Sequence, residues 1–126
     1  MAVELNHTIV NASDKRRSAQ FMAEVLGLDP PTVFGPFLEV AVANGVTLDF
    51  ADFDGEITPG HYAFLLSEAE FDDVFGRIKE RQVDHWADPA RSRPNEINHN
   101  DGGRGVYFVD PDGHFLEILT RPYTKD

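Results

Sequence analysis

The stretch GVYFVDPDGHFLEIL, residues 105–119, contains two apolar runs separated by a short polar turn. Asp112 and Gly113 both favour turn conformations, so the pattern predicts a β-hairpin. The second run carries one carboxylate, Glu117, among apolar neighbours: Phe115, Leu116, Ile118 and Leu119. A buried, unpaired carboxylate is strongly disfavoured, so such a group is normally ion-paired or bound to a metal. Glu117 therefore requires a partner, either a charged side chain from elsewhere in the chain or a bound metal.

The composition is that of an acidic globular chain without cysteine. Of the 126 residues, 22 are acidic and 11 are basic, which gives a net charge of −11. This balance argues against nucleic acid and membranes as partners, because both are bound by basic patches. The absence of cysteine excludes disulfides, thiolate nucleophiles and cysteine-ligated zinc.

The length and the amino terminus set further expectations. A chain of 126 residues is long enough for one compact domain, so we expect a single domain over residues 1–126. The amino-terminal MAVELNHTIV lacks the basic region and cleavage site of a signal peptide, and no apolar run approaches the ~20 residues of a membrane helix. We therefore expect a cytoplasmic protein.

The chain has the same order of elements twice: a strand, a helix, then a hairpin. In the first half we expect a strand at VELNHTIV (3–10), a helix over about 14–26 and a hairpin at FLEVAVANGVTLDFA (37–51). In the second half we expect a strand at HYAFLLS (61–67), a helix over about 68–81 that opens with a capping box, and the hairpin at 105–119. A long polar loop, residues 88–104, precedes this last hairpin.

The two halves can be aligned on polar residues inside apolar strands. A shift of 54 residues places His7 on His61, and a shift of 68 places Asp49 on Glu117. Side chains alternate between the faces of a strand, so His114, three residues before Glu117, points the opposite way and is not expected to share its partner. The alignment favours an internal duplication.

Two imidazoles and one carboxylate from three strands are the set that a facial metal site requires. Taken singly, a strand His is usually a hydrogen-bonded core residue, and a strand Glu usually pairs with an arginine such as Arg104 or Arg121. Their occurrence in one repeat register favours a metal held by His7, His61 and Glu117. Asp49 occupies the fourth equivalent position, where a fourth ligand, a supporting contact or a solvent-facing role are all open.

The long loop and the strand after it hold further candidates. Long loops often cover sites, and the cationic side chains here could contact an anionic or phenolic substrate or remain solvated: Arg91, Arg93, His99 and Arg104. Tyr107 shares the face of Glu117 by even spacing, as a proton donor or as an aromatic wall. Trp86 and Phe108 are expected in the core.

These residues resemble a known family, the vicinal oxygen chelate superfamily, which includes glyoxalase I, fosfomycin-resistance enzymes, bleomycin-resistance proteins and extradiol dioxygenases. The likeness rests on His7 in the first strand, HYAFLL (61–66) at the start of the second half, and VYFVDPDGHFLE (106–117) near the end. It extends from about residue 4 to 121. The resemblance implies an α+β fold of two tandem βαβββ modules, about 3–53 and 60–121, which form a curved mixed-sheet cup.

The resemblance also implies a ligand set and an assembly. His7, His61 and Glu117 match the three ligand positions for one divalent metal (Fe, Mn, Ni or Zn), in a homodimer whose modules can be exchanged. Extradiol dioxygenases add a tyrosine at the Tyr107 spacing and a histidine near His99, whereas glyoxalase I adds a carboxylate where this chain has Asp49. Fosfomycin enzymes also keep the tyrosine. Bleomycin-binding members usually lack the metal ligands.

The sequence thus predicts a metal-dependent enzyme acting on a small oxygenated molecule, either a lyase or isomerase of the glyoxalase type or a ring-cleaving dioxygenase. Glu117, Tyr107 and His99 are the expected catalytic residues. The alternative is a non-catalytic, drug-sequestering protein of the bleomycin-resistance type.

Overall fold

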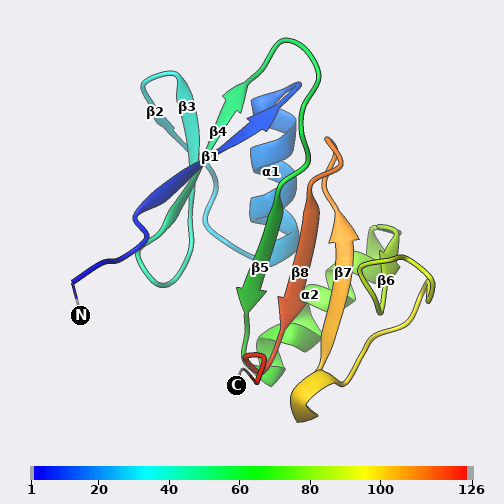
Figure 1. Cartoon of the computed structure of the whole chain (residues 1–126). Coiled ribbons are helices and arrows are strands. Elements are labelled where there is room, and N and C mark those ends of the chain that lie inside the picture. Colours follow the sequence, from blue (N-terminus) through cyan, green and yellow to red (C-terminus); the bar gives the residue numbers. More distant parts are fainter. Residues whose placement is uncertain (1, 125–126) are drawn as a thin grey trace. The chain divides into compact units, whose positions relative to one another are not determined.

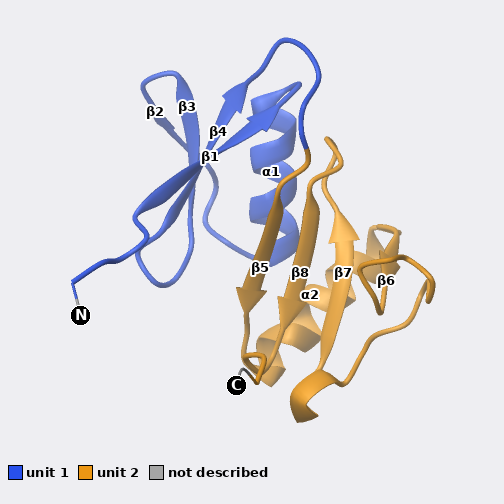
Figure 2. Cartoon of the chain, viewed as in Figure 1, with its two compact units in different colours: residues 1–58 blue, residues 59–126 orange. Residues whose placement is uncertain are grey.

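The computed structural model describes residues 2–124, and the chain divides into two compact units, residues 1–58 and 59–126 (Figure 2). Each unit carries a long helix and a four-stranded mixed sheet (Figure 1). Each follows the order strand, helix, three strands. The predicted fold class, two tandem βαβββ modules, is therefore confirmed. That both units belong to one domain stays a prediction.

The first unit contains one helix and four strands: β1 (His7–Ala12), α1 (Lys15–Leu26), β2 (Thr32–Phe34), β3 (Phe37–Ala41) and β4 (Thr47–Asp52). Its sheet has the order β1-β4-β3-β2, with β1 and β4 parallel and the other pairs antiparallel. The strand predicted from residue 3 begins only at His7, where pairing with β4 starts. The three-residue β2 was not predicted from the strand pattern.

The second unit repeats this plan: β5 (His61–Leu65), α2 (Glu68–Glu80), β6 (His85–Trp86), β7 (Gly105–Val109) and β8 (Phe115–Leu119), with a short 3₁₀ helix, η1 (Asn100–Gly102). Its sheet has the matching order β5-β8-β7-β6, again with the first pair parallel. Isolated bridges within the long loop join Trp86 to Pro94 and Asn98 to Gly105.

Strand register confirms the proposed alignment of the halves. Ile9 pairs with Asp49 in the first unit, and Ala63 pairs with Glu117 in the second. His7 and His61 likewise stand at the first paired position of β1 and β5. Asp49 and Glu117 are therefore equivalent positions of two copies of one architecture.

Helix ends follow local chemistry. The Asp14 carboxylate accepts from the backbone N–H groups of Arg16 and Arg17, and α1 ends at Gly27, whose φ of 71° suits a residue without a side chain. The predicted capping box opens α2, with the Ser67 and Glu70 side chains each bonding the other's backbone N–H.

The core of the second unit forms where α2 packs on one sheet face. Leu116 and Ile118 of β8 are fully buried, as are Phe71 and Ile78 of α2. Glu117 lies between those two strand residues, so alternation turns it to the other face of the sheet. It is nevertheless buried, and on that face its carboxylate contacts the side chains of His61 and Tyr123.

Candidate functional site

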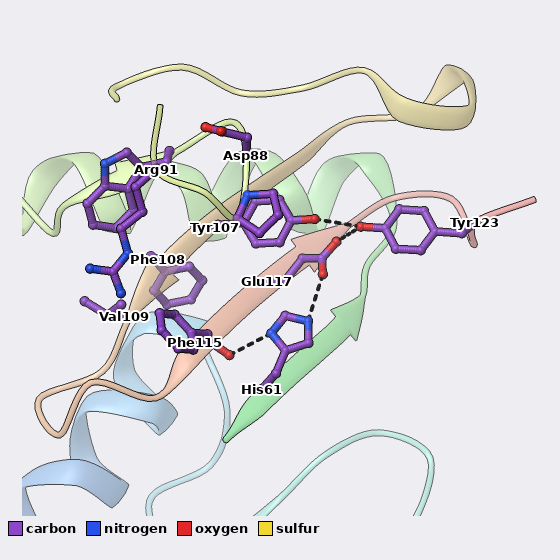
Figure 3. Close-up of a pocket in the computed structure, with 11 residues that line it drawn as sticks. His61, Asp88, Arg91, Tyr107, Phe108, Val109, Phe115, Glu117 and Tyr123 are labelled. Atoms are coloured by element: carbon purple, nitrogen blue, oxygen red, sulfur yellow. Dashed lines mark hydrogen bonds and ion pairs between the residues drawn. The ribbon is translucent and has the colours of Figure 1, made fainter. Parts of the chain in front are cut away.

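A pocket of about 430 Å³ lies within the second unit (Figure 3). Aromatic side chains from β6, β7 and β8 form much of its lining: Trp86, Tyr107, Phe108 and Phe115. Its polar groups are His61, Asp88, Arg91, Glu117 and Tyr123. Apolar walls with a few polar groups are the usual composition of small-molecule sites, and this volume falls in their range of roughly 300–1,000 Å³.

His61 and Glu117 meet across the parallel pair β5–β8. The Nε2 atom of His61 lies 3.2 Å from Oε1 of Glu117, and its Nδ1 atom lies 3.1 Å from the backbone carbonyl oxygen of Phe115. The carboxylate side chain is 3% exposed and the imidazole 51%. Within the pocket the partner of Glu117 is thus His61 and not Arg104, which bonds elsewhere.

This pair fits a divalent metal by its donor chemistry. A hydrogen on Nδ1 of His61 donates to the Phe115 carbonyl, which leaves Nε2 as the ligand nitrogen; this is the arrangement that metal-binding histidines usually show. The facing carboxylate supplies an oxygen donor and a negative charge.

The second carboxylate oxygen of Glu117 is held by a tyrosine that sequence reasoning missed. The hydroxyl of Tyr123 donates to Oε2, and the hydroxyl of Tyr107 lies 3.0 Å from that of Tyr123. Tyr123 follows the last strand in a segment with no periodic pattern, so only its spacing of six residues from Glu117 could have indicated it.

Burial and the nearby carboxylate keep both phenols protonated. Burial raises the pKa of Tyr107, and the negative charge of Glu117 adds to the rise. Burial also raises the pKa of Tyr123, with the hydrogen bond to Glu117 as a further cause. The site can therefore offer neutral O–H donors beside the Glu117 carboxyl group.

Tyr107 and Glu117 share one face of the sheet, as their even spacing predicted, and lie directly opposite each other on β7 and β8. The ring of Tyr107 also stacks near that of His61, with a centroid distance of 6.4 Å. Three predicted site residues, His61, Tyr107 and Glu117, are thus gathered in one pocket.

His7 and Asp49 belong to the first unit. His7 is exposed on β1, with Nδ1 2.8 Å from the Asn6 side-chain oxygen. Asp49 is 4% exposed on β4, where it accepts a hydrogen bond from the Thr47 hydroxyl. Over the described residues, neither unit by itself gathers three His, Asp or Glu side chains into a possible metal site.

Only one of the predicted cationic loop residues lines the pocket. Arg91 does so, whereas Arg104 forms ion pairs with Glu68 (2.7 Å) and Asp72 (2.8 Å) and lies over the Phe71 ring. Arg104, which directly precedes β7, is therefore engaged with α2. Arg93 pairs with Glu96 at 3.1 Å.

His99 precedes η1 as an exposed residue and is not among the residues that line this pocket. Its catalytic role stays a prediction.

The core placement of Phe108 is confirmed, but Trp86 is only partly buried and forms part of the pocket wall, because β6 is a two-residue edge strand. His114 is buried away from the pocket and accepts a hydrogen bond from the Gly60 N–H, in agreement with the alternation argument.

The chain is similar to several characterised proteins. The structure titled Oxidase ChaP-H1 is 63% identical, with a TM-score of 0.96 over 98% of this chain and 100% of that chain. Among curated proteins, Glutathione transferase FosA of Serratia marcescens is 28% identical over 94% of this chain and 81% of its own length. Metallothiol transferase FosB of Shouchella clausii is 30% identical over 92% of this chain and 79% of its own length.

The fold and the pocket are those of a small-molecule-binding protein built from two tandem βαβββ modules. The chain belongs to the Glyoxalase/Bleomycin resistance protein/Dioxygenase superfamily, whose family model matches residues 4–118. The resemblance to vicinal oxygen chelate proteins is thus confirmed. The similar proteins are named as an oxidase and as transferases, which are enzymes of more than one reaction type, and the chain is a metal-dependent enzyme of this superfamily. Among the described residues, no helix is long and apolar enough to cross a membrane.

Proposed function

We propose that this protein is a divalent-metal-dependent oxidase or oxygenase that acts on a phenolic molecule with two adjacent oxygens. The observation that carries the proposal is the pairing of His61 with the buried Glu117 at one end of an aromatic pocket. The oxidase named among the relatives, at 63% identity, supports the oxidative type over the lyase or isomerase type.

The proposed ligands are His61 and Glu117 from the second unit and His7 from the first. His7 occupies in its unit the strand position that His61 occupies in the other. Two histidines and one carboxylate are the donor set of a facial metal site, and His7 is proposed for it from its repeat position alone. When bound, such a metal supplies Lewis-acid polarisation of adjacent substrate oxygens.

The surrounding residues have separate roles in the proposal. Tyr123 holds Oε2 of Glu117 and so fixes the carboxylate orientation. Tyr107, as a neutral phenol next to Tyr123, can donate a hydrogen bond or a proton to a substrate oxygen. The rings of Phe108 and Phe115 exclude water and bind a flat substrate. His99 is retained as a proposed acid or base from the long loop.

The family also supports a homodimer, in which the third ligand can come from the same chain or from the partner. Mixed sheets with exposed edges and apolar side chains favour such an assembly; Val33 and Phe34 of the edge strand β2 are 80% and 60% exposed.

A second candidate function is thiol transfer, which the FosA and FosB relatives favour. It requires a thiol co-substrate and an electrophile such as an epoxide, whereas the oxidase requires only dioxygen and the phenol. A third candidate function, sequestration of a drug without turnover, agrees less well with the presence of the His61–Glu117 pair.

The test is metal content followed by a reaction screen. Protein purified without chelator is analysed for metal, then loaded with Fe(II), Mn(II), Ni(II) or Zn(II). Oxygen uptake is measured with catechols and dihydroxynaphthalenes, and thiol consumption with glutathione and fosfomycin. We expect about one metal per chain and oxygen uptake that Glu117→Gln removes. Thiol consumption without oxygen uptake would favour the transferase, and binding without any product would favour the sequestering protein.

A further inference from the structure

We infer that Arg91 is a specificity residue that binds the carboxylate of a planar aromatic substrate, at the end of the pocket remote from Glu117. The inference deepens the proposed function, on which it rests, by naming a substrate class: a fused or extended aromatic acid. It is carried by the place of the guanidinium in the pocket, by its unused hydrogen-bond donors and by the loop that holds it.

The guanidinium of Arg91 lies between two aromatic rings of the pocket lining. Its central carbon is 5.0 Å from the centroid of the Trp86 ring and 4.9 Å from that of Phe115. Stacking of this kind leaves the edge of the planar guanidinium, with its N–H donors, free to bond an oxyanion. Within residues 2–124 no carboxylate lies within ion-pair distance of this side chain, in contrast to Arg93 and Arg104.

The loop backbone is built to hold Arg91 in this position. Arg91 has a φ of 61°, a left-handed conformation that costs an ordinary residue of order 1 kcal/mol. The turn is closed by a bond from the Arg91 N–H to the Asp88 carbonyl oxygen, at 3.1 Å. The Asp88 carboxylate accepts from the backbone N–H groups of Ser92 and Arg93, at 3.0 and 2.9 Å. Such strain persists where a specific side-chain placement is stabilised by its surroundings.

The nearest negative charge in the lining is already engaged. Asp88 lines the same pocket as Arg91, but its carboxylate is bonded by the loop, and the Ser92 hydroxyl holds the pKa of Asp88 below its usual range. The Asp88 carboxylate therefore stabilises the turn and forms no ion pair with the Arg91 guanidinium. The loop gives Arg91 no carboxylate partner, so a carboxylate on the substrate can form an ion pair with its guanidinium.

The pocket has two chemically distinct ends. Figure 3 shows Arg91 on one side and the cluster of His61, Glu117 and Tyr123 on the other, with the rings of Phe108 and Phe115 between them. A substrate that presents adjacent oxygens to the Glu117 end therefore extends its flat body along aromatic walls toward the guanidinium. A carboxylate at that far end is the group that a guanidinium binds best, by paired hydrogen bonds.

The test uses ligands without adjacent oxygens, so that it does not depend on metal chelation. Titration calorimetry of the full chain, as purified, compares 2-naphthoate with its neutral analogue 2-naphthamide and with the saturated analogue decahydronaphthalene-2-carboxylate. We expect 2-naphthoate to bind about tenfold more tightly than either analogue, because one charge-assisted contact and one flat aromatic surface are each lost. Trp86, the single tryptophan of the chain, gives a second readout by its fluorescence.

Variants then assign the preference to Arg91. Arg91→Gln should bind the acid and the amide equally, and Arg91→Lys, which keeps the charge but not the planar fork, should retain part of the preference. Arg93→Gln is the matched control from the same loop, whose side chain pairs with Glu96, and it should behave as wild type. Equal binding of acid and amide by wild-type protein, absence of binding by both, or a preference that survives Arg91→Gln would each overturn the inference. A failed metal analysis would reject the proposed function and leave these affinities unaffected.

Discussion

At the scale of single residues, Glu117 determines what the pocket can do. Replacing its carboxylate by an amide keeps the shape but removes the charge that a metal requires. We expect Glu117→Gln to lose most bound metal while its circular dichroism spectrum and melting transition show a folded protein. His61→Ala should likewise lose metal. Elemental analysis of purified variants provides the measurement.

His114→Ala is the control for this prediction. The residue lies three positions from Glu117 but is buried elsewhere and bonds the Gly60 N–H. The variant should melt at a lower temperature, because the Gly60 N–H loses its acceptor, and still keep wild-type metal content. Metal that stays bound after Glu117→Gln, or that disappears after His114→Ala, would contradict the assignment.

Tyr123 allows a separate prediction, because it touches the carboxylate and not the proposed metal. Tyr123→Phe removes only the hydroxyl that holds Oε2 of Glu117. Loss of such a supporting contact typically weakens metal affinity by about 10- to 100-fold. Competition with a coloured chelator measures this affinity without any turnover. Unchanged affinity would show that Glu117 keeps its orientation without the phenol.

The sequence predicted the residues that follow strand alternation, named Arg91 only as one of four loop candidates, and missed Tyr123. Glu117 and Tyr107 face one another because both lie on strands of known phase, and His114 points away for the same reason. Tyr123 and Arg91 lie on segments without a repeating pattern, where position depends on tertiary contacts that no spacing rule describes.

At the scale of elements, the two helices and both hairpins were predictable because their signals are local. Capping groups fix the starts of α1 and α2, and the Asp112–Gly113 turn fixes the last hairpin. The strands β2 and β6 are three and two residues long, too short for alternation to show, and they form by pairing with neighbours. Sequence patterns thus reveal elements with their own propensity and miss those defined by a partner.

The contact between α2 and the loop end just before β7 gives a prediction at this scale. Arg104 at this loop end bonds Glu68 and Asp72 and lies over the Phe71 ring, and none of these four residues lines the pocket. Because exposed ion pairs are individually weak, Arg104→Met should lower the melting temperature by only a few degrees and leave the 2-naphthoate affinity unchanged. Arg91→Gln should show the reverse: its affinity for 2-naphthoate should fall, and its melting temperature should stay nearly constant. Weaker 2-naphthoate binding by Arg104→Met, or a large drop in melting temperature for Arg91→Gln, would contradict the assignment of Arg104 to stability and of Arg91 to ligand binding.

At the scale of the whole molecule, assembly can be measured directly. The superfamily and the exposed edge strand β2 lead us to expect a homodimer. Light scattering at micromolar concentration should report twice the mass of the chain. A stable species of 14.1 kDa, with full metal content, would contradict this expectation and place all ligands in one chain.

The response of global stability to alkaline pH follows from the tyrosines. Burial raises the pKa of Tyr62, Tyr107 and Tyr123 above the ordinary value of 10.0, and these are all three tyrosines of the chain. Above that value the unfolded chain releases phenol protons that the folded chain retains, so unfolding becomes more favourable as pH rises. The stability that these groups contribute is complete below the unfolded pKa and is lost as pH passes through the folded values.

Absorbance at 295 nm, which reports tyrosinate, measures this effect together with urea unfolding. In folded protein we expect little tyrosinate at pH 10, whereas in urea-unfolded protein half of the signal should be present there. The urea midpoint should be constant between pH 8 and 9 and fall progressively above about pH 10. Tyr123→Phe should reduce that fall, because its phenol is held both by burial and by the Glu117 carboxylate. Titration of all three phenols near pH 10 in the folded chain would contradict this expectation, and the neutral phenol donors beside Glu117, Tyr107 and Tyr123, would then be lost at the same pH.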